Sequence, residues 1–340
     1  MIRHRTFAAA LSLMLSAVAF NAVAAPARMQ AIVQSGGNDA ASLKLQTIDT
    51  PKPAAGQVLI QVYAAGVNPV DWKRRMNAPP PAAGAAPVIP GFDVAGIVDS
   101  VGSGVTAVKA GDPVFARANG AYAQYAVADA GSVMRKPSGL TFQQAAGIPV
   151  AGVAGHRAAD EARIQRGHRV AVIGAAGGAG SAAVVVAKDR GARVVAVGHS
   201  SQQPYLASLG VDEFVAYDKD DVATKVGTVD AVLNMVDGQA EAGLGYVKRG
   251  GRFTSIAGGP REDHCRAAGV TCVVIGPGYA GPPMIDTLRA LAMLADAGKY
   301  DVTVSRTFPL AQAAAAQELN RTSDTTGKIV LIVDPKSSER

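Results

Sequence analysis

The segment from residue 169 to residue 197 constrains the fold of this chain more than any other. A Val/Ile-rich run of strand length (169–173) leads into four glycines and three alanines (174–180), a helical stretch and a second strand-length run (193–197). A strand that turns into a helix through residues without bulky side chains leaves the first helical N–H groups open to a pyrophosphate. This order predicts a dinucleotide-binding unit. The alternative is a Gly/Ala-rich turn that allows close packing of helix on strand.

The chain changes character near residue 150. Up to residue 127 the apolar runs are short and β-rich, and turn clusters separate them, which predicts a mostly antiparallel, barrel-like unit. Beyond residue 150, Val/Ile-rich runs alternate with helical stretches, which predicts a parallel sheet with crossovers. The stretch 78–87 is apolar but lacks periodicity, and we interpret it as a mobile loop.

Composition excludes several other classes of protein. The 33 Lys and Arg outnumber the 27 Asp and Glu and give a net charge of +6, but the basic residues are scattered, so we expect no nucleic-acid partner. Charged residues make up 18% of the chain, which is too few for a disordered polyelectrolyte. Two cysteines exclude a disulfide-dense scaffold and a four-cysteine zinc site.

Residues 1–24 have the pattern of a secretory signal peptide. A basic start precedes an apolar run (7–20) and the small-residue site Ala22-Val23-Ala24. We expect cleavage after Ala24 and a periplasmic or secreted protein. The run is shorter than the roughly 18 residues of a spanning helix, so we expect no stable membrane insertion after cleavage. The alternative is translation from Met29, which would give a cytoplasmic protein.

Cys265 and Cys272 lie seven residues apart across a predicted connection from a helix to a strand. In an oxidising compartment they would be able to form a disulfide, whereas in the cytosol they would be ordinary thiols. The sequence leaves both states open.

The residues after the second strand of the dinucleotide unit bear on which cofactor binds. An NAD site normally holds an acid about 20 residues past the glycines, where it bonds the ribose hydroxyls. Here the strand ends in Gly198-His199-Ser200-Ser201, and no acid follows until Asp212. The residues predict an uncharged, hydroxyl-rich pocket that admits a 2′-phosphate, which favours NADP(H), although no Arg or Lys lies nearby.

Several further motifs occur in a specific order. They are 66–73 (GVNPVDWK), 90–98 (PGFDVAGIV), 101–105 (VGSGV), 111–114 (GDPV), 149–152 (PVAG), the glycine loop and 326–330 (TGKIV). On these motifs the chain resembles the medium-chain dehydrogenase/reductase superfamily over roughly residues 29–334. Within that superfamily it is most similar to the zinc-independent quinone oxidoreductases and NADPH-dependent enone reductases.

The resemblance implies an α/β fold in which a GroES-like β-barrel domain is split around a Rossmann domain with a doubly wound parallel sheet. After the signal peptide (1–24), the first part of the catalytic domain would span 25–148 and the Rossmann domain 149–281. Residues 282–336 would return to the catalytic domain. The active site would lie in the cleft between the domains. Relatives are often dimers, so the resemblance also implies a homodimer.

The resemblance also implies a set of cofactor-binding residues. Gln203 stands where relatives often have a phosphate-binding Lys, which weakens the assignment of NADPH. No metal is expected, because Val67-Asn68 stands where the zinc enzymes place their first ligand cysteine. The implied cofactor-binding residues are Asn68; Gly177, Gly178, Ala179 and Gly180 at the pyrophosphate; Ser200, Ser201 and Tyr217 at the 2′-phosphate of the adenosine end; Asn234, Ala257 and Gly258 on the nicotinamide side; and Lys328 from the far domain.

Reduction of a quinone or enone builds negative charge on oxygen, so the site needs a hydrogen-bond donor aimed at that atom. Asn68 and Lys73 are the catalytic candidates, although a solvent-facing role for Lys73 stays open. We interpret Asp71 as a turn or capping residue and Trp72 as a packing anchor. An Asn68→Ala change is expected to lower turnover by about tenfold or more while the fold stays intact.

These observations lead to a hypothesis of function. The chain is expected to transfer a hydride from NADPH to a quinone or an α,β-unsaturated carbonyl compound, with a small molecule as its substrate. One alternative is an enoyl-thioester reductase on the same scaffold. Another is an exported cofactor-binding protein with little or no turnover.

Overall fold

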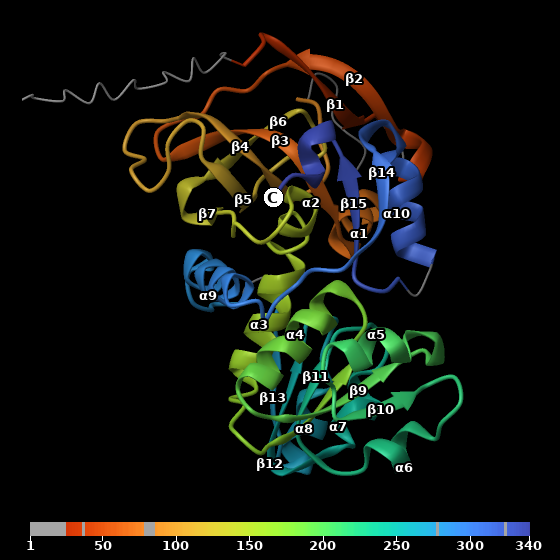
Figure 1. Cartoon of the computed structure of the whole chain (residues 1–340). Coiled ribbons are helices and arrows are strands. Elements are labelled where there is room, and N and C mark those ends of the chain that lie inside the picture. The colour runs from red at the N-terminus through yellow and green to blue at the C-terminus, as the bar shows by residue number, and fades with distance from the viewer. Residues whose placement is uncertain (1–24, 36–37, 78–85, 277–278, 323–324) are drawn as a thin grey trace, which may run out of the picture.

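The computed structural model describes residues 25–35, 38–77, 86–276, 279–322 and 325–340, and these residues form two lobes (Figure 1). The upper lobe in this view is built on antiparallel strands and the lower lobe on a parallel sheet covered by helices. The predicted α/β class, a GroES-like barrel domain with a Rossmann domain, is confirmed. Within the described residues, no helix is both long and apolar enough to cross a membrane. The expectations for residues 1–24 and for most of the 78–87 loop fall outside the described residues.

The lower lobe contains a parallel sheet with the strand order β10-β9-β8-β11-β12-β13. The order reverses at β8, because β9 pairs with one edge of β8 and β11 with the other. A reversal of this kind opens a crevice at the carboxyl end of the central strand, where ligands of such sheets bind. The strands are β8 (Arg169–Ile173), β9 (Arg193–Gly198), β10 (Glu213–Ala216), β11 (Val229–Asn234), β12 (Val247–Ser255) and β13 (Thr271–Val274).

Helices cover both faces of this sheet, as the alternating sequence pattern predicted. Strands that are buried on both faces carry mostly Val, Ala, Ile and Leu, and these residues form the packed layers on either side. The helices are α3 (Ala151–Glu161), α4 (Gly178–Asp189), α5 (Gln203–Ser208), α6 (Val222–Val226), α7 (Ala240–Leu244) and α8 (Glu262–Ala268).

The strand β3 (Gln57–Val67) is central to the upper lobe. It pairs antiparallel with β4, β6 and β15. Its last residues, Gly66 and Val67, therefore lie beside Asp93 of β4 and Ile329 of β15, which are distant from them in the sequence. Gly66 allows this close approach, because a Cβ there would lie 2.3 Å from the carbonyl oxygen of Ala146. The other elements of this part are β1 (Arg28–Gln34), β2 (Leu43–Asp49), α1 (Pro69–Asn77), β4 (Asp93–Val101), β5 (Pro113–Arg117), β6 (Tyr125–Asp129), β7 (Val133–Arg135) and α2 (Phe142–Ala145).

The last segment of the chain returns to the upper lobe. After α9 (Met284–Asp296), which packs on α3, the strands β14 (Val304–Pro309) and β15 (Lys328–Ile332) extend the sheet of β3, with α10 (Ala313–Thr322) between them. Ile329 of β15 is paired with Val67 of β3. This register places Lys328 next to the start of α1.

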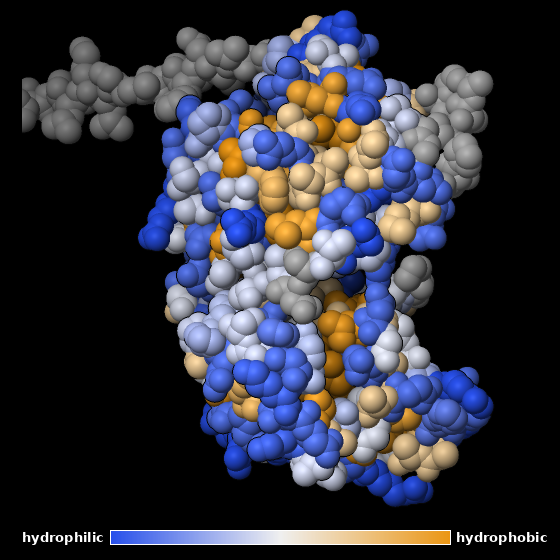
Figure 2. Space-filling view, turned by 90° about the vertical axis from the view of Figure 1, so that its right-hand side faces the viewer, coloured by the Kyte–Doolittle hydropathy of each residue, from blue (hydrophilic) through white to orange (hydrophobic). Residues whose placement is uncertain are grey.

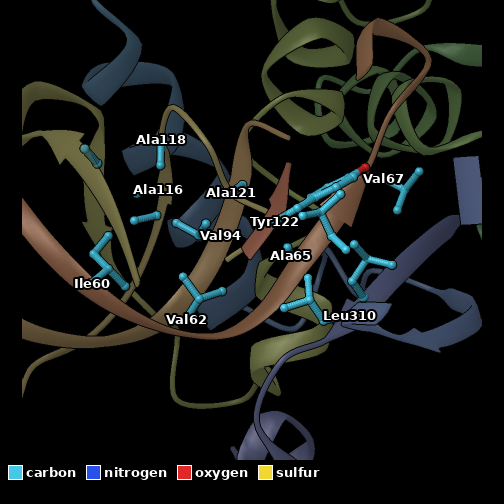
Figure 3. Packing of buried hydrophobic residues seen from close by; sticks show 14 of the residues in the cluster. Ile60, Val62, Ala65, Val67, Val94, Ala116, Ala118, Ala121, Tyr122 and Leu310 are labelled. Atoms are coloured by element: carbon cyan, nitrogen blue, oxygen red, sulfur yellow. The ribbon is translucent and has the colours of Figure 1, made fainter. Parts of the chain in front are cut away.

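The interior of the upper lobe is a hydrophobic cluster formed by residues of β3, β4, β5 and the C-terminal segment (Figure 3). Tyr122 is among the largest fully buried side chains in it. Its hydroxyl leaves the apolar cluster and donates to Oδ2 of Asp71 on α1, at 2.8 Å. The core of the lobe therefore ends in a polar contact at the side that carries α1.

A disulfide joins Cys265, in the middle of α8, to Cys272 on β13. The sequence had left the state of these two residues open. The Cα atoms are 6.2 Å apart, which lies within the usual range for a disulfide. The bond attaches the last helix of the Rossmann lobe to the edge strand of its sheet.

Candidate active site

The glycine loop between β8 and α4 is held by backbone contacts. The N–H groups of Gly174 and Ala175 both donate to the carbonyl oxygen of Val197, each at 3.1 Å. Gly174 has a φ of +75°, which favours glycine. A Cβ on Gly180 would lie 2.1 Å from the carbonyl oxygen of Gly174, so this position excludes every side chain.

The start of α4 offers open donors. The N–H of Ser181 donates to the carbonyl oxygen of Gly177 at 2.8 Å, which is the first backbone hydrogen bond of the helix. The N–H groups of residues 178–180, which precede it in the helix, have no backbone acceptor of this kind within the first turn. A Cβ added to Gly177 would meet no atom closer than 3.8 Å, which leaves the outer face of the loop clear. These features fit the pyrophosphate of a dinucleotide.

The loop also contacts the upper lobe. The N–H of Gly327 donates to the carbonyl oxygen of Ala176 at 2.7 Å, and Gly327 forms a parallel bridge with Gly177. A Cβ on Gly178 would lie 2.6 Å from Cδ of Lys328. The stem of Lys328 therefore lies directly on the glycine loop, although it belongs to the other lobe.

The ammonium of Lys328 is part of a buried polar group that we call the buried cluster: Asn68, Asp71, Asp93, Tyr122 and Lys328. Lys328 Nζ donates to Asn68 Oδ1 (2.5 Å) and to the carbonyl oxygen of Val67 (2.8 Å), and lies 3.9 Å from Asp93 Oδ2. Asn68 Nδ2 donates to the same Asp93 oxygen at 2.8 Å. Each member is at most 4% exposed.

Burial changes the acidity of these groups. It raises the pKa of Asp93 to about 6, against the opposing effects of the Lys328 charge and the Asn68 amide. It raises the pKa of Asp71 to about 7, although the Asn68 N–H and the Tyr122 hydroxyl both favour the carboxylate. It lowers the pKa of Lys328, which Asp93 and Asp71 oppose. The carboxyl groups of Asp71 and Asp93 therefore take up and release protons near neutral pH.

The two predicted catalytic residues lie in different environments. Asn68 is 1% exposed and both atoms of its amide are bonded, so its removal would leave Lys328 and Asp93 each short of a partner. An Asn68→Ala change is therefore not expected to leave the fold unaffected, in contrast to the expectation from sequence. The Lys73 side chain is 41% exposed, and its Nζ contacts Oδ2 of Asp237, beyond β11 in the other lobe, at 2.5 Å.

The neighbours of these residues have structural contacts. Asp71 accepts the backbone N–H of Asn68 at 2.8 Å, which closes the turn that begins α1. Trp72 is half-buried, and its Nε1 donates to Oδ1 of Asn320 on α10 at 3.0 Å. No group of three or more His, Cys, Asp or Glu within the described ranges is arranged to hold a metal ion.

Predicted nicotinamide-side residues lie at the carboxyl ends of β11 and β12. Asn234 is fully buried, and its Nδ2 donates to Oγ of Ser255 at 3.0 Å. The same oxygen accepts the N–H of Ala257 at 3.1 Å, and Gly258 follows with a φ of +78°. Ser255 was missed from the sequence because its role depends on the pairing of β11 with β12.

Predicted adenosine-side residues lie at the end of β9, where the expectation of an uncharged pocket is wrong. Ser200 donates both its N–H and its Oγ–H to the carboxylate of Asp218, each at 2.7 Å. These bonds hold the pKa of Asp218 below its usual range. Ala216 is paired with Gly198, so the parallel register of β10 and β9 brings in an acid 18 residues further along the chain.

Other groups at this end are also bonded to one another. His199 Nδ1 is 2.9 Å from Ser201 Oγ, and its Nε2 is 3.5 Å from Asp218. The half-exposed ring of Tyr217 meets the His199 ring edge-on at 5.8 Å between centroids. Figure 2 shows the narrowing of the molecule between the lobes, with apolar surface in the hollow beside it.

Two protein families match the sequence. The alcohol dehydrogenase GroES-like domain matches residues 54–138, and the zinc-binding dehydrogenase family matches residues 209–331. The NADPH-dependent alkenal/one oxidoreductase of Arabidopsis thaliana chloroplasts is 30% identical over 91% of this chain and 81% of its own length. The quinone oxidoreductase of Mus musculus is 31% identical over 86% of this chain and 94% of its own length.

Solved structures show the same architecture. The quinone oxidoreductase from Coxiella burnetii superposes with a TM-score of 0.79 at 28% identity, over 90% of this chain and 99% of that one.

A mycocerosic acid synthase-like polyketide synthase of Mycobacterium tuberculosis is 31% identical over 91% of this chain. The match spans only 16% of that synthase, so it concerns one portion of a much longer protein.

Proposed function

This chain belongs to the medium-chain dehydrogenase/reductase superfamily, in its quinone and enone reductase branch, and we propose that it transfers a hydride from NADPH to a quinone or an α,β-unsaturated carbonyl compound. One observation supports this most directly. Lys328 lies with its stem on the glycine loop and its ammonium in the buried cluster. It therefore connects the predicted pyrophosphate cradle with the polar residues of the other lobe.

When bound, the nicotinamide cofactor supplies the hydride, and the chain provides position and charge. The open N–H groups at the start of α4 would hold its pyrophosphate. Lys328 connects the upper lobe to the loop through its stem, which lies beside Gly178, while Asn68 and the Val67 carbonyl hold its ammonium within the upper lobe. Lys73 presents a partly exposed ammonium at the boundary of the lobes, where it can stabilise charge on a substrate oxygen.

The cofactor class is NAD(P)H, and a preference for NADPH is part of the proposal. Ser200, Ser201 and the half-exposed Tyr217 support it, as does the NADPH dependence in the name of the Arabidopsis relative. Asp218 opposes it, because a carboxylate repels the 2′-phosphate. Titration of the protein with both cofactors tests the preference, and equal affinities for NADH and NADPH would contradict it.

A second candidate is an enoyl-thioester reductase, which the match to the polyketide synthase favours. The test is to purify the protein, measure its thermal stabilisation by NADPH, and follow NADPH absorbance with small quinones, enones and enoyl thioesters. Oxidation of NADPH by quinones or enones supports the leading proposal, whereas oxidation by thioesters alone supports the second. Stabilisation without turnover on any substrate indicates a cofactor-binding protein.

The proposal includes export of the protein and its assembly as a homodimer. The pattern of residues 1–24 supports export, and the disulfide between Cys265 and Cys272 is compatible with an oxidising compartment. Mass spectrometry of the protein from fractionated cells tests export, which requires loss of residues 1–24 in an extracytoplasmic fraction. A protein that begins at Met29 in the cytoplasm would contradict it. Light scattering tests the dimer.

A further inference from the structure

The basic run Lys73-Arg74-Arg75 on α1 has three different environments. Lys73 is paired with Asp237. Arg75 is 2% exposed, and each of its three guanidinium nitrogens donates one hydrogen bond, to Gln317 Oε1 (2.9 Å), the carbonyl oxygen of Asn38 (2.7 Å) and Glu318 Oε1 (3.0 Å). The exposed Arg74 has no carboxylate partner among the described residues, and its guanidinium lies 4.6 Å from the centre of the Phe92 ring.

A second guanidinium lies against the same ring. Arg117 at the end of β5 is 5.4 Å from the centre of the Phe92 ring and forms no salt bridge in the described part of the chain, although its charge opposes the burial that raises the pKa of Asp93, its neighbour across the strands. Phe92 itself is buried, so the ring is a fixed support for both cations. Two like charges that converge on one ring repel each other, and a bound anion would remove that repulsion.

Arg74 and Phe92 line two cavities of about 340 and 380 Å³, each large enough for part of a small molecule. Arg117 lines the first. The second has an apolar wall from Val88 to Pro90, and it reaches Asp71 of the buried cluster. The first cavity therefore holds both arginines, the second holds Arg74 and Asp71, and Arg74 and Phe92 line both.

Two carboxylates also face these cavities. Asp129 lines the first, where it accepts Gln57 Nε2 at 3.1 Å and pairs with neither arginine. Asp71 lines the second, and its Oδ1 is buried with no hydrogen-bond partner in the described residues. An anion is therefore favoured near Arg74 and Arg117, whereas the Asp71 end suits a neutral or hydrogen-donating group.

We infer that Arg74, Arg117 and Phe92 form a subsite for the carboxylate of the substrate, so that the preferred substrate is an unsaturated oxo acid with a short apolar portion. The inference rests on the proposed reduction of enones and names the class of enone. Arginine forks match a carboxylate with two parallel hydrogen bonds. The apolar wall from Val88 to Pro90 would contact the carbon chain.

The kinetic test compares 4-oxopent-2-enoate with its methyl ester, which differs in charge but keeps the enone. The double variant Arg74→Gln/Arg117→Gln is expected to lower kcat/KM for the acid by about tenfold or more while the ester changes less than about twofold. The double variant Lys44→Gln/Arg306→Gln, on β2 and β14, also removes two exposed positive charges from the upper lobe; it is the matched control and should change neither. Equal losses on acid and ester, or no loss on the acid, would overturn the inference.

A binding test separates this inference from the proposed function. Calorimetric titration of the NADPH-saturated protein with 4-oxopentanoate, which has no carbon–carbon double bond to reduce, should show binding that the double variant loses. Its methyl ester should bind wild type and variant alike. If no enone is reduced but the keto acid binds through the arginines, the proposed function fails and the subsite stands. If enones are reduced without dependence on charge, the subsite fails and the function stands.

Discussion

The two ends of the predicted cofactor site are built in different ways. At the pyrophosphate end, backbone groups and glycines set the geometry, and the buried Lys328 connects it to the other lobe. At the adenosine end, exposed or half-buried side chains bond one another, with Ser200 holding Asp218. The pyrophosphate end is therefore inseparable from the fold, whereas the adenosine end is free to change cofactor selectivity without loss of stability.

The largest effect is expected from Lys328→Met, which tests whether the first end is part of the fold. The free energy of unfolding should fall by about 3–5 kcal/mol, because Asn68, Asp93 and the Val67 carbonyl lose a buried cation. Urea unfolding measures this change. Lys225→Met, on the exposed side of α6, is the control. If the free energy of unfolding falls no more in Lys328→Met than in the control, the pyrophosphate end is no more part of the fold than the adenosine end.

Gly180→Ala tests the geometry of the glycine loop. The added Cβ would lie 2.1 Å from the carbonyl oxygen of Gly174, so the loop must move, and affinity for NADPH should fall by about 100-fold. Gly131→Ala is the matched control, because no atom lies within 4 Å of its added Cβ. Fluorescence titration of bound NADPH measures both. Unchanged affinity in Gly180→Ala would show that the loop does not bind the cofactor.

Asn68→Ala tests the link between the buried cluster and turnover. We expect turnover to fall by about tenfold and stability to fall as well, because Lys328 and Asp93 each lose a hydrogen bond. Turnover is therefore measured below the unfolding transition of the variant. Asn77→Ala, at the exposed end of α1, is the control. A stability loss with normal turnover would make Asn68 a structural residue only.

The smallest effect is expected from Asp218→Asn at the adenosine end. The change removes a negative charge beside the predicted 2′-phosphate, so NADPH affinity should rise by about three- to tenfold while NADH affinity and stability stay nearly constant. Asp189→Asn, at the end of α4, controls for net charge. Titrations with both cofactors measure the change. An equal rise for NADH and NADPH would show that Asp218 does not distinguish them.

Local patterns predicted the elements better than the contacts between them. The strand-length runs at 57–67, 169–173 and 328–333 predict β3, β8 and the start of β15, because hydrophobic periodicity and glycines are local signals. The β12 strand begins at Val247, four residues before the strand-length run at 251–256, and the sequence did not predict α1 as a helix. Propensity is weak in both segments, which packing against neighbours stabilises.

The site was less predictable because it depends on register. Asp218 reaches Ser200 through the pairing of β10 with β9, and Lys328 reaches Asn68 across 260 residues of sequence. No local signal distinguishes Arg74 from its bonded neighbour Arg75, because the difference comes from the partners that α10 supplies to one of them. Resemblance to a family supplied Lys328 as a candidate, whereas its bonds came only from the structure.

The return of the chain to its first lobe also sets an order of events during synthesis. The strands of the parallel sheet lie within one continuous stretch, from Arg169 to Val274, so this lobe can fold while the chain is still being made. The upper lobe needs β15 (Lys328–Ile332), which follows the whole of the parallel sheet in the chain. The bridge between Gly177 and Gly327 therefore cannot form until every strand of the parallel sheet has been synthesised, so the dinucleotide lobe has all its strands before the active site is complete.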